Sequence, residues 1–156
     1  MRTRRHLAGA VVSAEPERIL FGRTGIGPGQ IGVFLSNADG TGEHALLQPA
    51  ADDYDPTWSP DGQWIAFTSE RDGSADLYRV KPDGTSLERL TDSPAYDDQA
   101  SFSPDGQQLV FVTTRAGGTG DLWILSGFYG RAGFHCSAPQ RRCNIRWKPR
   151  NASSDA

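Results

Sequence analysis

The sequence predicts an all-β fold built from short antiparallel strands, and three observations support this. A segment of about 44 residues recurs along the chain. Short apolar runs alternate with turns rich in Gly, Pro and Asp, which is typical of strands joined by tight connections. No stretch has the roughly ten residues of helical periodicity that an α-helix needs.

The repeat is clearest between residues 53–73 and 97–117, which align at an offset of 44 residues without a gap. Nine of these 21 positions are identical, whereas average residue usage would give about one match. A degenerate earlier copy lies at an offset of 46 residues and includes Ile19 and Phe21. A unit of this length is the size of one four-stranded blade of a β-propeller.

Each unit divides into four short strands. In the central copy we expect them at residues 56–59, 64–69, 76–80 and 87–90. Ser59-Pro60-Asp61-Gly62 has the residue types of a type I turn. A Gly-containing loop at 70–75 follows the second strand, and Pro82-Asp83-Gly84-Thr85 contains the Asp-Gly pair that favours a tight hairpin.

The strands are apolar on both faces, which decides among the all-β architectures. Trp64, Ile65, Ala66 and Phe67 run together, as do residues 109–112 and 122–125. A sandwich with one solvated face would alternate polar and apolar residues, whereas blades stacked radially are covered on both sides. We therefore predict an incomplete β-propeller of about two and a half to three four-stranded antiparallel blades, since four blades would need about 176 residues.

Several motifs of this repeat resemble a known family. The central copy reads PTWSPDG at 56–62, IAFTS at 65–69, RDG at 71–73, DLY at 76–78 and LT at 90–91. This pattern resembles the β-propeller repeat of TolB-like proteins, which also occurs in the propeller domains of prolyl-oligopeptidase-type serine hydrolases. The resemblance implies a propeller that binds proteins, and for TolB itself a periplasmic role in cell-envelope assembly.

The composition excludes other classes of protein. No apolar run approaches the roughly 20 residues that span a bilayer, so we expect no membrane span. A net charge of −3 offers no basic surface for nucleic acid. Two cysteines are too few for a disulfide framework. Residues 27–32 fit a GxGxxG pattern but precede an apolar strand instead of a helix, so we predict a hairpin loop and no cofactor.

We predict a non-enzymatic module that binds a protein partner through its inter-blade loops. The chain has no Gly-x-Ser-x-Gly motif, and its histidines, His6, His44 and His135, are scattered, so a serine hydrolase centre is not expected. Two alternatives remain open. One is the propeller domain of a prolyl-oligopeptidase-like peptidase whose catalytic domain lies outside this chain, and the other is a truncated product without function.

Acidic and tyrosine residues cluster in the connections between units. They are Asp52, Asp53, Tyr54, Asp55, Tyr96, Asp97 and Asp98. If these connections lie on one face, they form an acidic surface that attracts a cationic partner or holds a cation. The alternative is that they are solvated turn residues, because Asp is favoured in turns.

The two ends of the chain differ from the repeats at 18–125. Residues 1–17 are either a degenerate first strand or a short leader, which leaves periplasmic, secreted and cytoplasmic locations open. Residues 1–125 carry 10 basic and 18 acidic side chains, whereas residues 126–156 carry six basic and one acidic, so we expect a basic irregular tail. Its His135, Cys136 and Cys143 are too few for a closed zinc site. The exposed faces of the terminal blades predict self-association.

Overall fold

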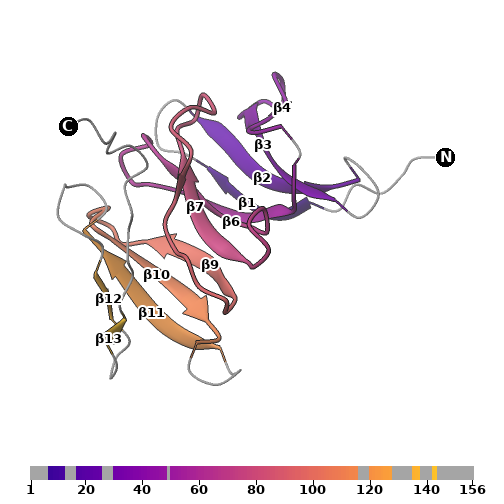
Figure 1. Ribbon diagram of the computed structural model, residues 1–156. Coiled ribbons are helices and arrows are strands. Elements are labelled where there is room, and N and C mark those ends of the chain that lie inside the picture. Colours follow the sequence, from indigo (N-terminus) through magenta and orange to yellow (C-terminus); the bar gives the residue numbers. More distant parts are fainter. Residues whose placement is uncertain are drawn as a thin grey trace, which may run out of the picture.

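The computed structural model describes the backbone of residues 7–12, 17–25, 30–48, 50–115, 120–127, 135–137 and 142–143. These residues form strands without any helix, and the strands make three antiparallel sheets. Figure 1 shows the sheets in a row, with the second between the first and the third. We call them sheets A, B and C. The prediction of an all-β, partial propeller with about three blades is confirmed.

The first two sheets are four-stranded meanders, in which each strand pairs with the next along the chain. Sheet A contains β1 (Leu7–Val12), β2 (Arg18–Thr24), β3 (Ile31–Asn37) and β4 (His44–Ala45). Sheet B contains β5 (Asp53–Trp58), β6 (Ile65–Ser69), β7 (Asp76–Val80) and β8 (Glu88–Arg89). The expected third strand at 76–80 matches β7, whereas β5 begins before the expected first strand and β8 is shorter than the expected fourth.

Sheet C has the same order and one further strand. It contains β9 (Asp97–Phe102), β10 (Gln108–Thr113), β11 (Asp121–Ser126), β12 (His135–Ser137) and β13 (Arg142–Cys143). The expectation of a wholly irregular tail is therefore corrected for the two segments 135–137 and 142–143. The cause is the free edge of β11, whose backbone N–H and C=O groups pair with a following segment whatever its side-chain pattern.

The turns between the first and second strands of sheets B and C are built alike. The Gly62 N–H donates to the Ser59 carbonyl oxygen at 2.9 Å, and the Gly106 N–H donates to Ser103 in the same way at 2.9 Å. The Ser59 hydroxyl oxygen also accepts the Trp64 N–H at 2.9 Å. Gly62 and Gly106 have φ of 68° and 70°, which glycine adopts without strain. The predicted type I turn is thus the local signal that starts the second strand.

Sheet B is covered on both faces. Towards sheet A it contributes Ile65, Phe67, Tyr78 and Val80 to one apolar cluster with residues of β2 and β3. Towards sheet C it contributes Ala66 and Leu77 to a second cluster with residues of β9, β10 and β11. Alternate residues of β6 therefore serve two separate cores, which explains why the strand is apolar throughout.

The first strand of each sheet makes the contacts with the preceding sheet. Strand β5 contacts β1, β2 and β3, and β9 contacts β5, β6 and β7. Strand β1 pairs with β2 in sheet A, so residues 7–12 correspond to the strand alternative for the N-terminal segment. The connections that lead into β5 and β9 therefore lie at the junctions between sheets.

Candidate functional site

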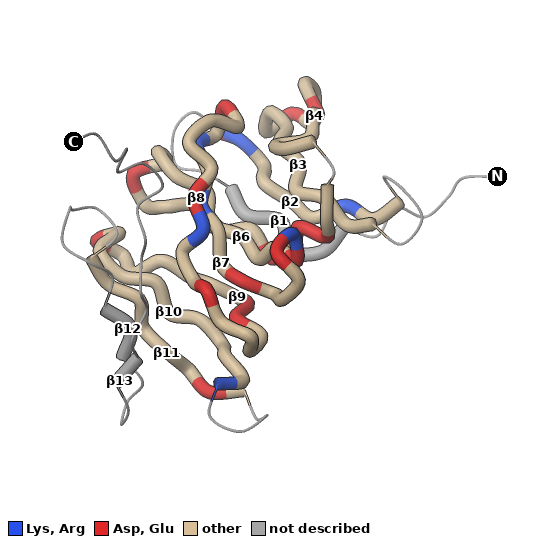
Figure 2. The backbone as a smooth tube through the Cα atoms, in the orientation of Figure 1, with Lys and Arg blue, Asp and Glu red and all other residues tan. Residues whose placement is uncertain are grey.

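The candidate site lies at one end of sheets B and C, where β5 and β9 begin. The register of sheet B pairs Asp53 with Ser69 and Ser69 with Asp76, so these three residues share this end of the sheet. Strand β9 joins them, because the Asp97 N–H donates to the Ala75 carbonyl oxygen at 2.8 Å. In Figure 2, red segments follow the chain from β8 into the start of β9.

The seven residues predicted from the sequence fall into three groups by burial. Asp53 and Asp97 are buried, with 4% and 0% of their surface exposed. Tyr96 is 60% exposed. The others are half-buried, namely Asp52, Tyr54, Asp55 and Asp98. The structure therefore brings the predicted residues to one end of sheets B and C but leaves only some of them accessible to a partner.

Asp53 and Asp97 are each held by an arginine of the neighbouring strand end. The Arg71 Nη2 group donates to Asp53 Oδ1 at 2.8 Å. Arg115 donates through Nε to Asp97 Oδ1 at 3.2 Å and also contacts the other carboxylate oxygen. The Thr113 hydroxyl donates to Asp97 Oδ1 at 2.5 Å. Because buried carboxylates need such partners, these two aspartates have a structural role at the site.

The two arginines also pack on aromatic rings of their own sheets. The Arg71 guanidinium carbon lies 4.9 Å from the centre of the Tyr78 ring, and that of Arg115 lies 5.4 Å from the Trp123 ring. Each ion pair therefore ties three strands of one blade together at this end. Both pairs occupy equivalent positions of the repeat, which makes this feature part of the blade itself.

A β-bulge follows each buried aspartate. In sheet B the register shifts between Tyr54 and Thr57, and in sheet C the same shift occurs on the equivalent part of β9. Asp55 and Gln99, which are equivalent in the repeat, have positive φ values of 48° and 53°. Such bulges bend the strand and change the direction of a side chain beside a site.

Half-buried carboxylates from two sheets influence one another here. Burial raises the pKa of the Asp55 carboxyl. Burial also raises the pKa of Asp98, and the negative charge of Asp55 raises it further. The pKa of the Tyr54 hydroxyl is raised by burial and by its 3.1 Å hydrogen bond to Glu70. Ionised carboxylates held close together in this way attract positive charge.

Asp52 links this end to sheet A. Its Oδ1 accepts the Ile31 N–H at 2.9 Å, and its carbonyl oxygen accepts the Glu70 N–H at 3.0 Å. The half-buried Asp52 carboxylate thus accepts the hydrogen bond of the first backbone N–H of β3. Asp52 therefore contributes both to the junction of the sheets and to the charge at this end.

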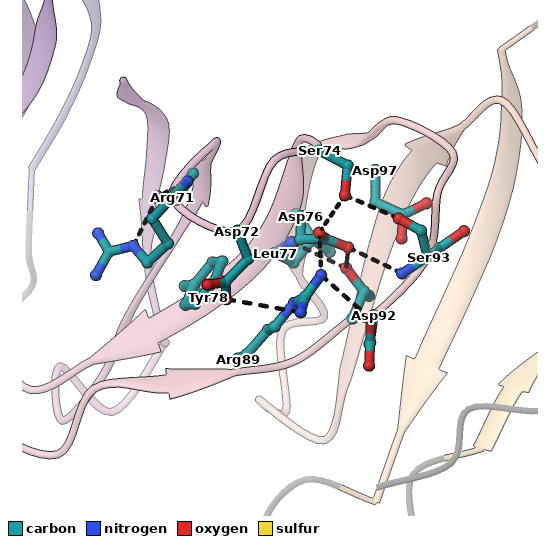
Figure 3. Close-up of polar contacts among 12 residues, drawn as sticks. Arg71, Asp72, Ser74, Asp76, Leu77, Tyr78, Arg89, Asp92, Ser93 and Asp97 are labelled. Carbon is teal, nitrogen blue, oxygen red and sulfur yellow. Dashed lines mark hydrogen bonds and ion pairs between the residues drawn. The ribbon is translucent and has the colours of Figure 1, made fainter. Parts of the chain in front are cut away.

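A buried network around Asp76, which was not predicted from the sequence, lies at the same end of sheet B (Figure 3). Asp76 Oδ2 accepts from the Ser74 hydroxyl at 2.8 Å and from Arg89 Nη2 at 2.6 Å, and Oδ1 accepts the Ser93 N–H at 3.2 Å. The Thr91 hydroxyl donates to Asp76 Oδ1 at 3.2 Å and accepts the Leu77 N–H at 2.9 Å. This network fixes the connection from β8 to β9, which carries Tyr96.

A signal for this network was present in the sequence. Asp76 recurs as Asp121 one repeat later, and the Leu90-Thr91 pair ends the unit. An Asp that recurs at the start of an apolar strand is not part of a turn. Its carboxylate becomes buried with the strand, so it needs a hydrogen-bond or ion-pair partner. Three of its four partners, Arg89, Thr91 and Ser93, lie 13 to 17 positions away, which only the fold could identify.

Residues 13–125 match the family model of the TolB beta propeller domain. The chain belongs to the TolB β-propeller domain family. The resemblance drawn from the repeat motifs is thereby confirmed.

Individual relatives of this TolB-type chain are longer proteins. The Tol-Pal system protein TolB of Desulfosudis oleivorans is 39% identical over 61 residues, which cover 39% of this chain and 14% of that protein. A putative TolB structure from Agrobacterium tumefaciens superposes with a TM-score of 0.69 at 26% identity, over 85% of this chain and 49% of that one. TolB from Acinetobacter baumannii gives 0.68 at 19% identity, over 86% and 32%. The chain spans half or less of the length of these relatives.

Other sequence predictions concern features outside this end of the TolB-type sheets. Among the residues that the structure describes, no group of three His, Cys, Asp or Glu side chains is arranged to hold a metal ion. No helix long and apolar enough for a bilayer occurs in the same residues. Part of the GxGxxG stretch, and the side chains of His135, Cys136 and Cys143, lie outside the described residues. Thr24, before this stretch, pairs with Ile31, near its end, across β2 and β3, as the predicted hairpin requires.

Proposed function

We propose that this chain is a non-enzymatic propeller module that binds a basic protein partner at the end of sheets B and C. The contact residues are Tyr54, Asp55, Tyr96 and Asp98, with Asp52 at the margin. The observation that carries the proposal is the convergence of Asp55 and Asp98, from two different sheets, on one half-buried acidic patch. Asp53 and Asp97 support this patch from beneath through Arg71 and Arg115.

The energetics of the patch favour binding over a purely structural role. Burial and mutual repulsion raise the pKa of Asp98, which means that its ionised form costs stability in the folded chain. Groups that cost stability are typical of functional sites. A basic partner would offset this cost, because its charge neutralises the carboxylates as it binds.

Tyr96 gives the patch an apolar contact beside the charges. Its ring is 60% exposed, while its backbone N–H is fixed by the Thr114 hydroxyl oxygen at 3.0 Å. Exposed tyrosines on an ordered backbone are frequent centres of protein interfaces. The Desulfosudis relative is the TolB protein of the Tol-Pal system, so we propose a protein partner of the same kind of assembly.

A photo-crosslinking experiment tests this proposal. The photoreactive residue p-benzoylphenylalanine replaces Tyr96 in one version of the full chain and Leu87 in a control version, because Leu87 is also exposed but lies in the β7–β8 connection. We expect the Tyr96 version alone to capture a protein in the native host. The double substitution Asp55→Asn and Asp98→Asn should reduce that crosslink at least about tenfold, by loss of charge attraction.

A second pair of charges provides the matched control. Asp39→Asn and Asp83→Asn remove the same charge from the two hairpins at the opposite end of sheets A and B, and should leave the crosslink intact. Equal capture from the two positions, or equal loss with the two double variants, would contradict the proposal.

The peptidase alternative rests on a similarity of fold. The puromycin hydrolase structure superposes with a TM-score of 0.63 at 17% identity, a level that shows the fold alone. If the chain served such an enzyme, the Tyr96 position would capture a peptidase domain. Mass spectrometry of the crosslinked product distinguishes a peptidase domain from any other protein.

A further inference from the structure

The connection between β8 and β9, residues 90–96, ends in the exposed Tyr96 and is bound to sheet B near its start. The Thr91 hydroxyl donates to Asp76 Oδ1 at 3.2 Å, and the Ser93 N–H donates to the same oxygen at 3.2 Å. One buried carboxylate thus holds the connection at two points. The position from which the chain runs on to Tyr96 is therefore set by Asp76.

The end of the connection is bound to both neighbouring sheets. The Tyr96 N–H donates to the Thr114 hydroxyl oxygen at 3.0 Å, and the Thr114 N–H donates to the Tyr96 carbonyl oxygen at 3.0 Å. The next residue, Asp97, donates its N–H to the Ala75 carbonyl oxygen at 2.8 Å. The backbone of Tyr96 is therefore held on both sides while its side chain stays 60% exposed.

Asp76 joins three separate segments and is itself out of reach of any partner. The Ser74 hydroxyl, from the β6–β7 loop, lies 2.8 Å from Asp76 Oδ2 and 2.9 Å from the Ser93 carbonyl oxygen. Arg89 of β8 provides the counter-charge at 2.6 Å (Figure 3). Because Asp76 is fully buried, any effect that it has on binding must act through the segments that it holds.

Sheet A has no such network at the equivalent positions of the repeat. At an offset of 44 residues, Gly32 stands where sheet B has Asp76, and Leu47 stands where it has Thr91. Neither a glycine nor a leucine has a side-chain hydrogen-bonding group. The network is therefore a property of the connection that leads to Tyr96 and is not required to form a blade of this type.

The residue equivalent to Tyr96 shows what the network makes possible. At the same offset this residue is Asp52, whose own Oδ1 accepts the Ile31 N–H at 2.9 Å. In sheet A the side chain at this position thus helps to hold the junction. Between sheets B and C the holding is done by Asp76, so the side chain of Tyr96 is left accessible.

We propose that Asp76 is a positioning residue for partner binding, which fixes the β8–β9 connection so that Tyr96 is presented in its binding position before the partner arrives. This inference rests on the proposed function, because it takes Tyr96 as a contact residue. A connection that is already ordered loses less conformational freedom on binding. The buried network therefore raises the affinity for the partner without touching it.

Amide hydrogen exchange followed by NMR tests the positioning without any partner. Asp76→Asn leaves one acceptor oxygen in place of two and removes the charge that pairs with Arg89. We expect the amides of Ser93 and Ala95 to exchange at least about tenfold faster, because the connection opens locally. Gly40→Ala is the control, since it lowers stability at a glycine with a φ of 81° in the β3–β4 hairpin, and it should leave both amides unchanged. Unchanged exchange in Asp76→Asn would overturn the inference.

Photo-crosslinking from position 96 tests the effect on binding. The full chain with p-benzoylphenylalanine in place of Tyr96 is compared with and without Asp76→Asn, and we expect this substitution to lower capture of the partner at least about fivefold. Gly40→Ala should leave capture unchanged, which separates positioning from a general loss of stability. Unchanged capture in Asp76→Asn, or equal losses in the two variants, would overturn the inference and leave the proposed function standing. No capture by the parent chain would refute the proposed function, and this inference with it.

A substitution at Thr91 keeps the test decisive if circular dichroism shows that Asp76→Asn does not fold. Thr91→Val keeps the shape of the side chain but removes the hydroxyl that donates to Asp76 and accepts the Leu77 N–H, whereas Thr91→Ser retains that hydroxyl. We expect Thr91→Val to lower capture at least about threefold and Thr91→Ser to restore it. Equal capture by these two variants would overturn the inference.

Discussion

At the scale of single residues, chemically identical side chains take opposite roles at this site. Asp97 is buried and bound by Arg115 and Thr113, whereas its neighbour Asp98 is half-buried and has a raised pKa. Successive residues of a strand point to opposite faces, so one carboxylate enters the blade and the next points away from it. The stabilising aspartate and the destabilising one are therefore adjacent in sequence.

Asp98→Asn should stabilise the chain at pH 7. The folded-state pKa of Asp98 is raised, so the native state bears a cost when the group is ionised, and this cost disappears as the pH falls through that pKa towards the ordinary value of about 3.9. We expect a gain of about 0.5 kcal/mol or less at pH 7, since solvent screens a half-buried charge. Urea denaturation at pH 7 and pH 4 measures it, and the gain should be smaller at pH 4.

Asp39→Asn is the control of opposite sign. Hydrogen bonds from Thr41 lower the pKa of Asp39, so its ionised form stabilises the fold at pH 7 and this contribution is lost as the pH falls. Asp39→Asn should therefore lower stability at pH 7. A loss of stability from Asp98→Asn at the same pH would show that the Asp98 carboxylate has a stabilising partner.

At the scale of elements, sheets A and B have the same hairpin turn, but the two turns contact different neighbouring segments. The β3–β4 and β7–β8 hairpins have the same Asp-Gly turn, and Gly40 and Gly84 have φ of 81° and 79°. A methyl group at Gly84 would lie 2.9 Å from the Leu46 carbonyl oxygen of the preceding sheet, whereas one at Gly40 would meet nothing. The glycine of this turn therefore has open space beside it in sheet A, whereas in sheet B it packs against the backbone of Leu46.

Substituting alanine at these two glycines separates the two effects. Gly40→Ala should cost about 1–2 kcal/mol through backbone strain alone. Gly84→Ala should cost at least about 1 kcal/mol more, because the hairpin must move away from sheet A. The free energy of unfolding in urea checks both. Equal losses would mean that the contact between this hairpin and Leu46 contributes nothing to stability.

At the scale of the whole molecule, stability is concentrated in the middle sheet. Sheet B has an apolar cluster on each face, whereas the face of sheet C that points away from sheet B carries Leu122, which is 60% exposed. A repeat protein of this kind gains stability from each interface between neighbouring units. The sheet with two such interfaces is therefore the most stable.

Hydrogen exchange followed by mass spectrometry should show this order. We expect the amides of β6 to exchange at least about tenfold more slowly than those of β10, because opening β6 disrupts both clusters. The exchange is measured in dilute solution, so that the predicted self-association of the terminal blades does not protect β10. Equal protection of β6 and β10 would indicate that the three sheets unfold as one unit.

Much of this architecture follows from the sequence alone because its causes are local. The Ser-Pro-Asp-Gly turn, the Asp-Gly hairpins and the apolar strands are set by residues within a few positions of one another, and their recurrence at 44 residues predicts the blades. The position of β7 was predicted to the residue. The acidic residues of the connections were expected to share one face, and the structure brings them to one end of sheets B and C.

Only the tertiary structure decided what each acidic residue does. Asp53 finds Arg71 and Asp76 finds Arg89 at separations of 18 and 13 positions, and a Coulombic effect of Asp55 on Asp98 requires two sheets to meet. The pairing of β12 with β11 likewise depends on a free backbone edge and not on side-chain pattern. Burial and charge pairing depend on three-dimensional contacts. Aspartates that look alike in sequence therefore become either buried, ion-paired residues or accessible residues only when the sheets pack.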